Sequence, residues 1–294
     1  MNLPKHVEIV EVSPRDGLQM LPLFVPTVDK IKLVNLAKDA GFKRIEAVSF
    51  VSPKHVPQMA DAGEILQAIG DDPNIDEVAL ALNQQGYQRA IESKVDWICY
   101  VMAATETMSL KNANTTIADG LAMTKNCIVD SHKQGVKVRG SIAVTWICPY
   151  EGVVPKERIL EITKELVEAG ADEIAYNDTV GKATPNDVFK LCQRAKEMFP
   201  NQQFAAHFHD TTFTALANIY AALTAGWNIF DSSAGGLGGC PFSPGASGNV
   251  ATEKVVSMLE RMGISTGIDL EKLKICSEFA KQIEAKAKAN IATT

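Results

Sequence analysis

Ala169-Gly170-Ala171-Asp172-Glu173-Ile174-Ala175-Tyr176 joins the end of a helical pattern to a short apolar run. The same order of residues recurs at Ala40-Gly41-Phe42 and at Ala225-Gly226-Trp227, where a glycine again precedes a run of strand-forming residues. Glycine readily adopts the left-handed backbone that commonly ends a helix, so each junction predicts a helix stop followed by a buried strand. This repetition favours parallel strands that are joined by right-handed crossovers.

Eight short apolar or β-branched runs alternate with helical patterns such as Thr27–Ala37, which combines a Thr or Asp cap with apolar residues at helical spacing. The eight runs are Val7–Val12, Arg44–Phe50, Glu77–Leu82, Trp97–Met102, Val136–Thr145, Glu173–Tyr176, Phe204–Phe208 and Asn228–Ser232. We therefore predict an α/β protein with a (β/α)8 TIM barrel. An open doubly wound sheet is the alternative, but no Gly-x-Gly-x-x-Gly fingerprint follows the first run.

The end of the chain, from Asp269 to Thr294, predicts one or two additional C-terminal helices and has too little apolar material for a second domain. We expect residues 1–294 to form a single TIM-barrel catalytic domain, with a helical extension over about 269–294.

The composition excludes several classes of protein. Hydrophobic residues make up 46% of the chain and charged residues 22%, which is typical of a soluble globular protein. A net charge of -6 argues against nucleic-acid binding, and no apolar stretch is long enough to cross a membrane. Six scattered cysteines without a Cys-x-x-Cys pair indicate reduced thiols, so we expect a cytoplasmic protein.

His207-Phe208-His209-Asp210 places two histidines one residue apart at the end of an apolar run. Side chains two apart on a strand lie on the same face, and two aligned imidazoles suit a divalent metal. The alternative is that one histidine is a hydrogen-bonded core residue and the other faces solvent.

Other polar residues follow the predicted strands and should meet at one mouth of the barrel. Asp16 and Asn249, together with His207 and His209, form a mixed oxygen and nitrogen set that favours Mg²⁺ or Mn²⁺, with Zn²⁺ or Co²⁺ as substitutes. Each has a structural alternative, since Asp16 could form a turn before Gly17 and Asn249 could cap a helix.

Arg15 follows the first strand and Glu46 lies in the second. A guanidinium at this mouth could hold an oxyanion that develops beside the metal, or it could only pair with a ligand carboxylate. Glu46 could be a buried partner of Arg15, and this role is compatible with a catalytic one.

Six glycines lie between Gly235 and Asn249, which is too many for a stable helix or strand. We predict a mobile lid that carries Cys240 over the substrate. A phosphate cradle is the alternative, but the segment lacks the Lys-Ser/Thr ending of a P-loop.

The chain resembles 3-hydroxy-3-methylglutaryl-CoA lyases, which are metal-dependent barrel enzymes, from about Val7 to Leu273. The resemblance is carried by four segments: Ser13-Pro14-Arg15-Asp16-Gly17-Leu18-Gln19, Ile45–Pro53, His207-Phe208-His209-Asp210-Thr211 and the cysteine-bearing stretch from Gly235 through Glu253. It implies retro-Claisen cleavage of a 3-hydroxyacyl-CoA into acetyl-CoA and a keto acid. It also implies that Asp16, His207, His209 and Asn249 hold the metal, that Arg15 steadies the thioester enolate, and that Glu46, Asp178 and Cys240 complete the active site, with Asp178 or a relay through His207 as the base.

Three positions depart from the pattern of these lyases. Met20-Leu21-Pro22 stands where Asn-Glu-Lys is common, Thr212-Phe213-Thr214 replaces an aromatic-Gly-Gln, and Asn177 stands where a small residue is frequent. The metal and enolate chemistry is retained, whereas the surroundings of the acyl group or of coenzyme A differ.

The sequence therefore predicts a lyase that cleaves 3-hydroxy-3-methylglutaryl-CoA. A relative acting on citramalyl-CoA or a longer 3-substituted glutaryl-CoA is the first alternative, and a catalytically silent acyl-CoA or metal-binding homologue is the second. The expected partner is an acyl-CoA substrate, without nucleic acid or membrane, in a homodimer or higher homo-oligomer.

Overall fold

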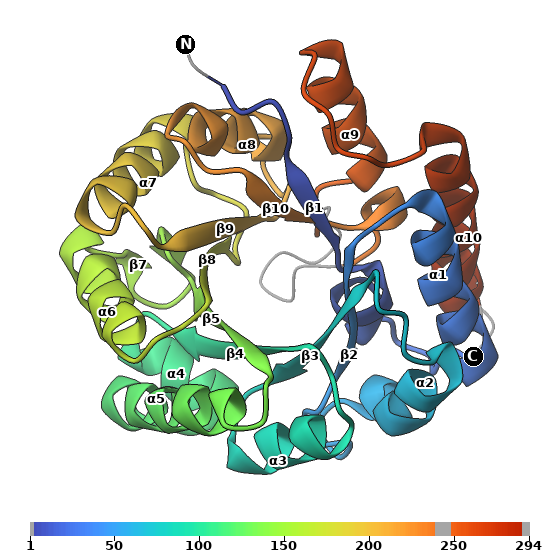
Figure 1. Cartoon of the computed structure of the whole chain (residues 1–294), viewed down its shortest axis with the longest axis horizontal. Helices are drawn as coiled ribbons and strands as arrows, with labels where there is room; N and C mark the ends of the chain where they lie inside the picture. Colours follow the sequence, from blue (N-terminus) through green and yellow to red (C-terminus); the bar gives the residue numbers. More distant parts are fainter. Residues whose placement is uncertain (1–2, 239–247, 290–294) are drawn as a thin grey trace.

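The computed structural model describes residues 3–238 and 248–289, and its centre is a closed barrel of eight parallel strands (Figure 1). The strands are β1 (Glu8–Glu11), β2 (Arg44–Ser49), β3 (Asp76–Ala81), β4 (Trp97–Ala103), β5 (Lys137–Ala143), β8 (Glu173–Asp178), β9 (Gln203–Phe208) and β10 (Ile229–Ser232). They pair in this order around the barrel, and β10 closes it against β1 through the pairs Glu8–Ile229 to Glu11–Ser232. The predicted TIM barrel is confirmed, and the open sheet is wrong.

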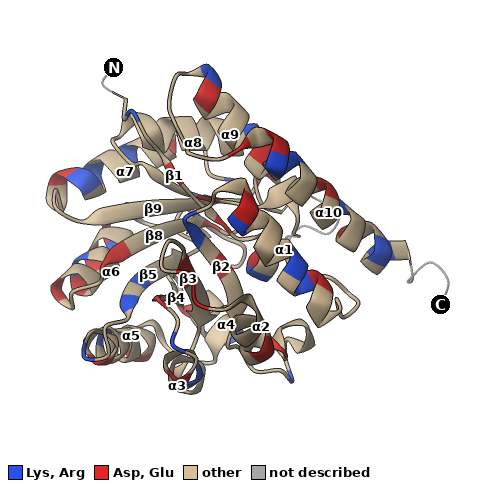
Figure 2. Cartoon of the chain, turned by 45° about the vertical axis from the view of Figure 1, so that its right-hand side comes forward, with Lys and Arg blue, Asp and Glu red and all other residues tan. Residues whose placement is uncertain are grey.

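Helices surround the barrel on its outer side, with acidic and basic residues interspersed along them (Figures 1 and 2). They are α1 (Thr27–Ala40), α2 (Ala62–Ile69), α3 (Gln84–Glu92), α4 (Glu106–Ala113), α5 (Ile117–His132), α6 (Lys156–Glu168), α7 (Pro185–Met198), α8 (Ala215–Thr224) and α9 (Thr252–Arg261). A further helix, α10 (Leu270–Ala289), packs on α1 and α9, which accounts for the predicted C-terminal extension. None of the helices in the described ranges is long and apolar enough to cross a membrane.

The predicted helix stops are confirmed, because Gly41, Gly170 and Gly226 all have positive φ angles between 89° and 100°. The predicted cap at the start of α1 is wrong. Pro26 occupies the cap position without a side-chain hydrogen bond, while the Thr27 hydroxyl donates to Asp61 at 2.9 Å.

The predicted run Val136–Thr145 overestimates the fifth strand, which ends at Ala143. Val144 has a φ of 53°, a left-handed conformation that is strained for a β-branched residue and incompatible with an extended strand. Its backbone N–H donates to the Thr179 hydroxyl instead of to a neighbouring strand. The chain then forms a small antiparallel hairpin, β6 (Ile147–Cys148) and β7 (Gly152–Val153), which the sequence did not predict.

Buried ion pairs form a connected network inside the barrel. Arg44 contacts Glu8 at 2.9 Å and Glu173 at 2.8 Å, and Glu173 accepts a second hydrogen bond from Arg139. Arg139 also donates to both oxygens of Asp231 at 2.8 and 2.9 Å. Because removing one partner would leave an uncompensated buried charge, these pairs constrain how the strands pack around the barrel centre.

Glu11, at the end of β1, joins three parts of the chain that lie far apart in sequence. Its Oε1 accepts hydrogen bonds from the backbone N–H groups of Ser13 and Ala234, and its Oε2 accepts one from the Thr252 hydroxyl. Burial raises the pKa of Glu11 to about 7, although these hydrogen bonds lower it. The fold therefore favours the neutral carboxyl.

Glu11→Gln should remove a pH-dependent contribution to stability. A carboxyl whose pKa is raised from 4.5 to about 7 stabilises the fold most below pH 4.5, and this advantage is lost as the pH rises through 7. Relative to the variant, the wild type should lose about 3 kcal/mol of unfolding free energy across this window. Urea denaturation at several pH values measures the difference, and identical pH profiles would contradict the prediction.

Candidate metal and substrate site

The carboxyl ends of the strands bring four of the predicted site residues to one mouth of the barrel. Arg15 and Asp16 lie on η1 (Ser13–Gly17), a π-helical turn directly after β1. His207 lies on β9, and His209 follows that strand. Potential ligand atoms of Asp16, His207 and His209 all lie within 4.8 Å of one another, so these three side chains could hold one metal ion.

The two imidazoles lie on the same side of their strand, as the His-x-His spacing predicts, with ring centroids 5.1 Å apart. His207 and His209 are both buried, with 7% and 6% exposure, so neither is the solvent-facing residue of the alternative.

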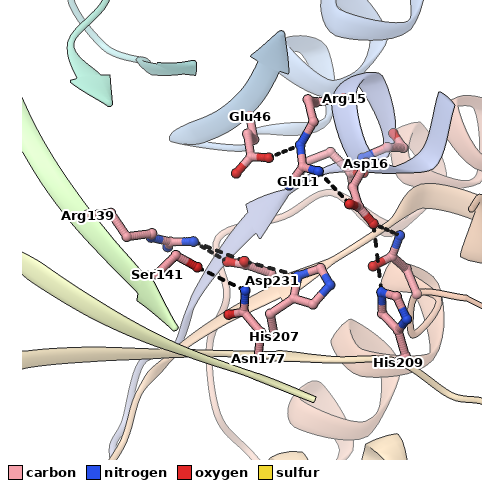
Figure 3. Close-up of polar contacts among 12 residues, drawn as sticks. Glu11, Arg15, Asp16, Glu46, Arg139, Ser141, Asn177, His207, His209 and Asp231 are labelled. Carbon is pink, nitrogen blue, oxygen red and sulfur yellow. Dashed lines mark hydrogen bonds and ion pairs between the residues drawn. The ribbon is translucent and has the colours of Figure 1, made fainter. Parts of the chain in front are cut away.

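Asp16 is the centre of the polar contacts (Figure 3). Its Oδ1 accepts a hydrogen bond from Arg15 Nη1 at 2.5 Å, and its Oδ2 accepts one from Asn249 Nδ2 at 2.7 Å. His209 Nε2 lies 3.9 Å from the same Oδ2. Burial raises the pKa of Asp16, but the positive charge of Arg15 and the nearby His209 imidazole hold it well below its usual range. The carboxylate is therefore ionised, as a metal ligand must be.

Asn249 reaches the site because its segment pairs with the end of β9. Asn249 forms an isolated bridge with His209, and Asp210 N–H donates to the Gly248 carbonyl at 2.7 Å. The predicted alternative of a helix cap is wrong, because Ala251 precedes α9. Within the described residues, the buried Asn249 Oδ1 has no hydrogen-bond partner. An unpaired oxygen beside an ionised carboxylate and two imidazoles fits a bound divalent cation.

Asp231 orients His207, and the sequence analysis missed this residue. Its Oδ2 lies 3.2 Å from His207 Nδ1, while both of its oxygens accept hydrogen bonds from Arg139. Burial raises the pKa of Asp231, but Arg139 outweighs this effect and lowers it to about 2. A carboxylate that binds Nδ1 fixes the ring and leaves Nε2 for a metal or a proton. An aspartate inside the apolar run Asn228–Ser232 was the signal that could have revealed it.

A cavity of about 230 Å³ opens at this mouth and combines a polar side with an apolar side. Arg15, Glu46 and the two histidines line the polar side, where Arg15 Nε donates to Glu46. The apolar side includes Leu80 on β3, Leu82 directly after that strand, Val101 on β4 and Met108 on α4. The cavity can thus take a ligand with a polar end and an apolar part.

Among the described residues, the predicted catalytic residue Asp178 does not line this cavity. The buried Asp178 carboxylate accepts hydrogen bonds from the backbone N–H groups of Lys182 at 3.1 Å and Ala183 at 2.9 Å. These contacts give it a structural role at the β8–α7 connection, because they compensate its buried charge. Cys240 and most of the predicted lid lie outside the described residues, so their roles stay predictions.

A parallel (β/α)8 barrel with this donor set at its carboxyl-terminal mouth defines the class of the protein as a TIM-barrel enzyme with a candidate metal site. The family model HMGL-like matches residues 6–279, and the chain belongs to this family. Relatives similar to the chain are named hydroxymethylglutaryl-CoA lyase, which is a carbon-carbon lyase.

Two curated relatives match nearly the whole chain. Hydroxymethylglutaryl-CoA lyase YngG from Bacillus subtilis is 42% identical over 97% of this chain and 95% of its own length. A 3-hydroxy-3-isohexenylglutaryl-CoA/hydroxymethylglutaryl-CoA lyase from Pseudomonas aeruginosa is 41% identical over 98% and 97% of the two chains. A solved structure of an HMG-CoA lyase from Acinetobacter baumannii, in complex with coenzyme A and 3-methylmalate, has 36% identity and a TM-score of 0.91, covering 97% of this chain and 93% of that one.

Asp231→Asn should weaken metal binding, because the amide is a poorer acceptor for the Nδ1–H of His207 and no longer balances Arg139. We expect a loss of about 10- to 100-fold in Mn²⁺ affinity, measured by calorimetric titration.

Glu173→Gln is the matched control, because Glu173 pairs with the same Arg139 and has no contact with His207 in the structure. It should lower thermal stability, and because Glu173 reaches His207 only through Arg139, it should reduce Mn²⁺ affinity by much less than Asp231→Asn does. Equal losses of affinity in the two variants would refute the orienting role of Asp231.

Proposed function

We propose that the protein cleaves 3-hydroxy-3-methylglutaryl-CoA into acetyl-CoA and acetoacetate by a divalent-metal-dependent retro-Claisen reaction. The observation that carries this proposal is the meeting of Arg15 with Asp16 and the two imidazoles beside one cavity. The names of the similar lyases, over nearly full length, support the substrate.

Asp16, His207, His209 and Asn249 would hold the metal. Their oxygen and imidazole atoms, without a thiolate, favour Mg²⁺ or Mn²⁺. When bound, the cation supplies Lewis acidity toward the carboxylate and hydroxyl oxygens of the substrate.

Arg15 would stabilise the negative charge that develops on the thioester oxygen. Arg15 donates from Nε to Glu46 and from Nη1 to Asp16, and these two contacts fix the orientation of the guanidinium. Its Nη2 group is left to donate to the thioester oxygen. Burial lowers the pKa of Arg15, but Glu46 and Asp16 outweigh it and raise the pKa, so the guanidinium stays charged. A fixed charged donor of this kind lowers the barrier because it needs no reorganisation during the reaction.

The proton transfers follow from the bond that breaks. A base takes the proton of the 3-hydroxyl, the O–H electron pair forms the ketone of acetoacetate, and the C2–C3 pair remains on C2 as the acetyl-CoA enolate. Asp178 is poorly placed as this base, because its carboxylate is engaged by two backbone amides. His207, whose Nδ1 contacts Asp231 and whose Nε2 would hold the metal, could take part only through a metal-linked relay. C2 then receives a proton, and Cys240 is our candidate for the donor.

A different 3-hydroxyacyl-CoA is the second candidate substrate. The structure of the Acinetobacter baumannii relative contains coenzyme A and 3-methylmalate, which supports an acyl-CoA as the ligand of this protein. It is also compatible with an acyl group other than 3-hydroxy-3-methylglutaryl. The placement of Arg15 against Glu46 speaks against a catalytically silent homologue. A single catalytic domain over 1–294, the homo-oligomeric state and the cytoplasmic location stay predictions.

Arg15→Gln should lower turnover of 3-hydroxy-3-methylglutaryl-CoA about 100- to 1,000-fold, because the enolate loses its charged donor. Acetyl-CoA release in the presence of Mg²⁺ or Mn²⁺ measures the loss, and metal content should stay near that of the wild type.

Arg194→Gln on the exposed side of α7 is the control and should retain wild-type turnover. The enolate role would be abandoned if Arg15→Gln kept more than about a tenth of the activity, a loss of less than 1.4 kcal/mol in transition-state stabilisation.

A further inference from the structure

Ser141 and Asn177 form a hydrogen-bonded pair at the edge of the same cavity (Figure 3). The Asn177 side-chain Nδ2 donates to the Ser141 hydroxyl at 2.9 Å, between the neighbouring strands β8 and β5. Both residues line the cavity, and this hydrogen bond joins their side chains to each other. The pair is therefore not part of the candidate metal-ligand set, but it lines the same cavity.

The strand register places this pair between the polar and apolar sides of the cavity. Asn177 on β8 pairs directly with His207 on β9, so its side chain emerges beside that imidazole. Ser141 on β5 pairs with Val101 on β4, which belongs to the apolar side. Along the barrel wall, the Ser141–Asn177 pair therefore lies between His207 and Val101.

The Asn177 amide is only half satisfied. Its Nδ2 contacts Ser141, whereas its buried Oδ1 has no hydrogen-bond partner within the described residues. The Ser141 hydroxyl can accept from the amide nitrogen of Asn177 or, if the amide is flipped, donate to its oxygen. In either orientation the other polar atom of the amide has no partner. An unpaired buried polar atom costs free energy, and it disfavours a purely apolar group packed against it.

We propose that the Ser141–Asn177 pair is a specificity element that selects the substituent on the carbon carrying the substrate hydroxyl. This inference rests on the proposed lyase function, and it names the part of the substrate that the pair would contact. The amide occupies space beside His207 and makes that space polar, so a methyl or other short substituent fits better than a long apolar one. Asn177 is also the position where this sequence departs from the small residue that is frequent in the lyases it resembles.

Asn177→Ala and Ser141→Ala test the proposal with two thioesters, 3-hydroxy-3-methylglutaryl-CoA and 3-hydroxy-3-isohexenylglutaryl-CoA. The quantity is the ratio of kcat/KM for the long substrate to kcat/KM for the methyl substrate. Asn177→Ala removes both the volume and the polarity of the amide, so we expect the ratio to rise about tenfold. Ser141→Ala leaves the amide in place with both of its ends unpaired, so the ratio should not rise above that of the wild type.

Asn218→Ala is the matched control. Asn218 is another buried asparagine with one amide end bonded, to the Ala183 carbonyl at 3.0 Å, and with an unpaired Oδ1, but it lies on α8 away from the cavity. Its loss should lower stability and leave the ratio unchanged.

Wild-type cleavage with an unchanged ratio in Asn177→Ala would overturn the specificity role alone. If Asn177→Ala is too unstable to assay, Asn177→Ser, which shortens the side chain and replaces the amide with a hydroxyl, must raise the ratio, or the proposal is wrong. Absence of turnover by the wild type with either thioester would overturn the proposed function together with this inference.

Discussion

The carboxylate of Asp231 is shared between a buried guanidinium and an imidazole, and the arrangement of the site depends on this one contact. Arg139 holds both carboxylate oxygens, and one of them also contacts His207 Nδ1. The same arginine is paired with Glu173 and through it with Arg44, so the orientation of His207 is linked to charges deep in the barrel. Because unpaired buried charges are strongly destabilising, the network cannot shift at one end without cost at the other. The interior of the barrel thus fixes the geometry of the mouth.

Closure of the barrel is the second condition for the site. Asp16 and Asn249 are 233 residues apart in sequence, yet their side chains form a hydrogen bond at 2.7 Å. This contact requires that β10 pair with β1 and that the segment after β10 return to the end of β9. Parallel strands with their carboxyl ends at one rim supply both requirements. A partly opened barrel would therefore lose the donor set before it lost most of its helices.

Local sequence signals predicted the barrel and the residues around the candidate metal site, because strand runs, glycine stops and the His-x-His spacing are local patterns. They did not predict Asp231, whose role depends on the register between β9 and β10 and on Arg139 from β5. They also placed Asp178 in the active site, whereas the backbone of its own loop binds the carboxylate. The end of β5 was missed for a similar reason, since the left-handed backbone of Val144 is stabilised by a contact with Thr179 from another strand connection. Long-range contacts decided the cases of Asp231 and Val144, whereas the conformation of a local loop decided that of Asp178.

The central claim is that Asp16, which follows the first strand, and His207, His209 and Asn249, which come late in the sequence, bind a single cation beside Arg15. A crystal structure of the protein grown with Mn²⁺, with anomalous diffraction recorded to locate the metal, tests this most directly. The account predicts one strong peak about 2.0–2.3 Å from an oxygen of Asp16, an oxygen of Asn249 and a nitrogen of each of His207 and His209. A peak that lacked Asp16 as a ligand, or a fully loaded protein whose metal lay elsewhere, would contradict it.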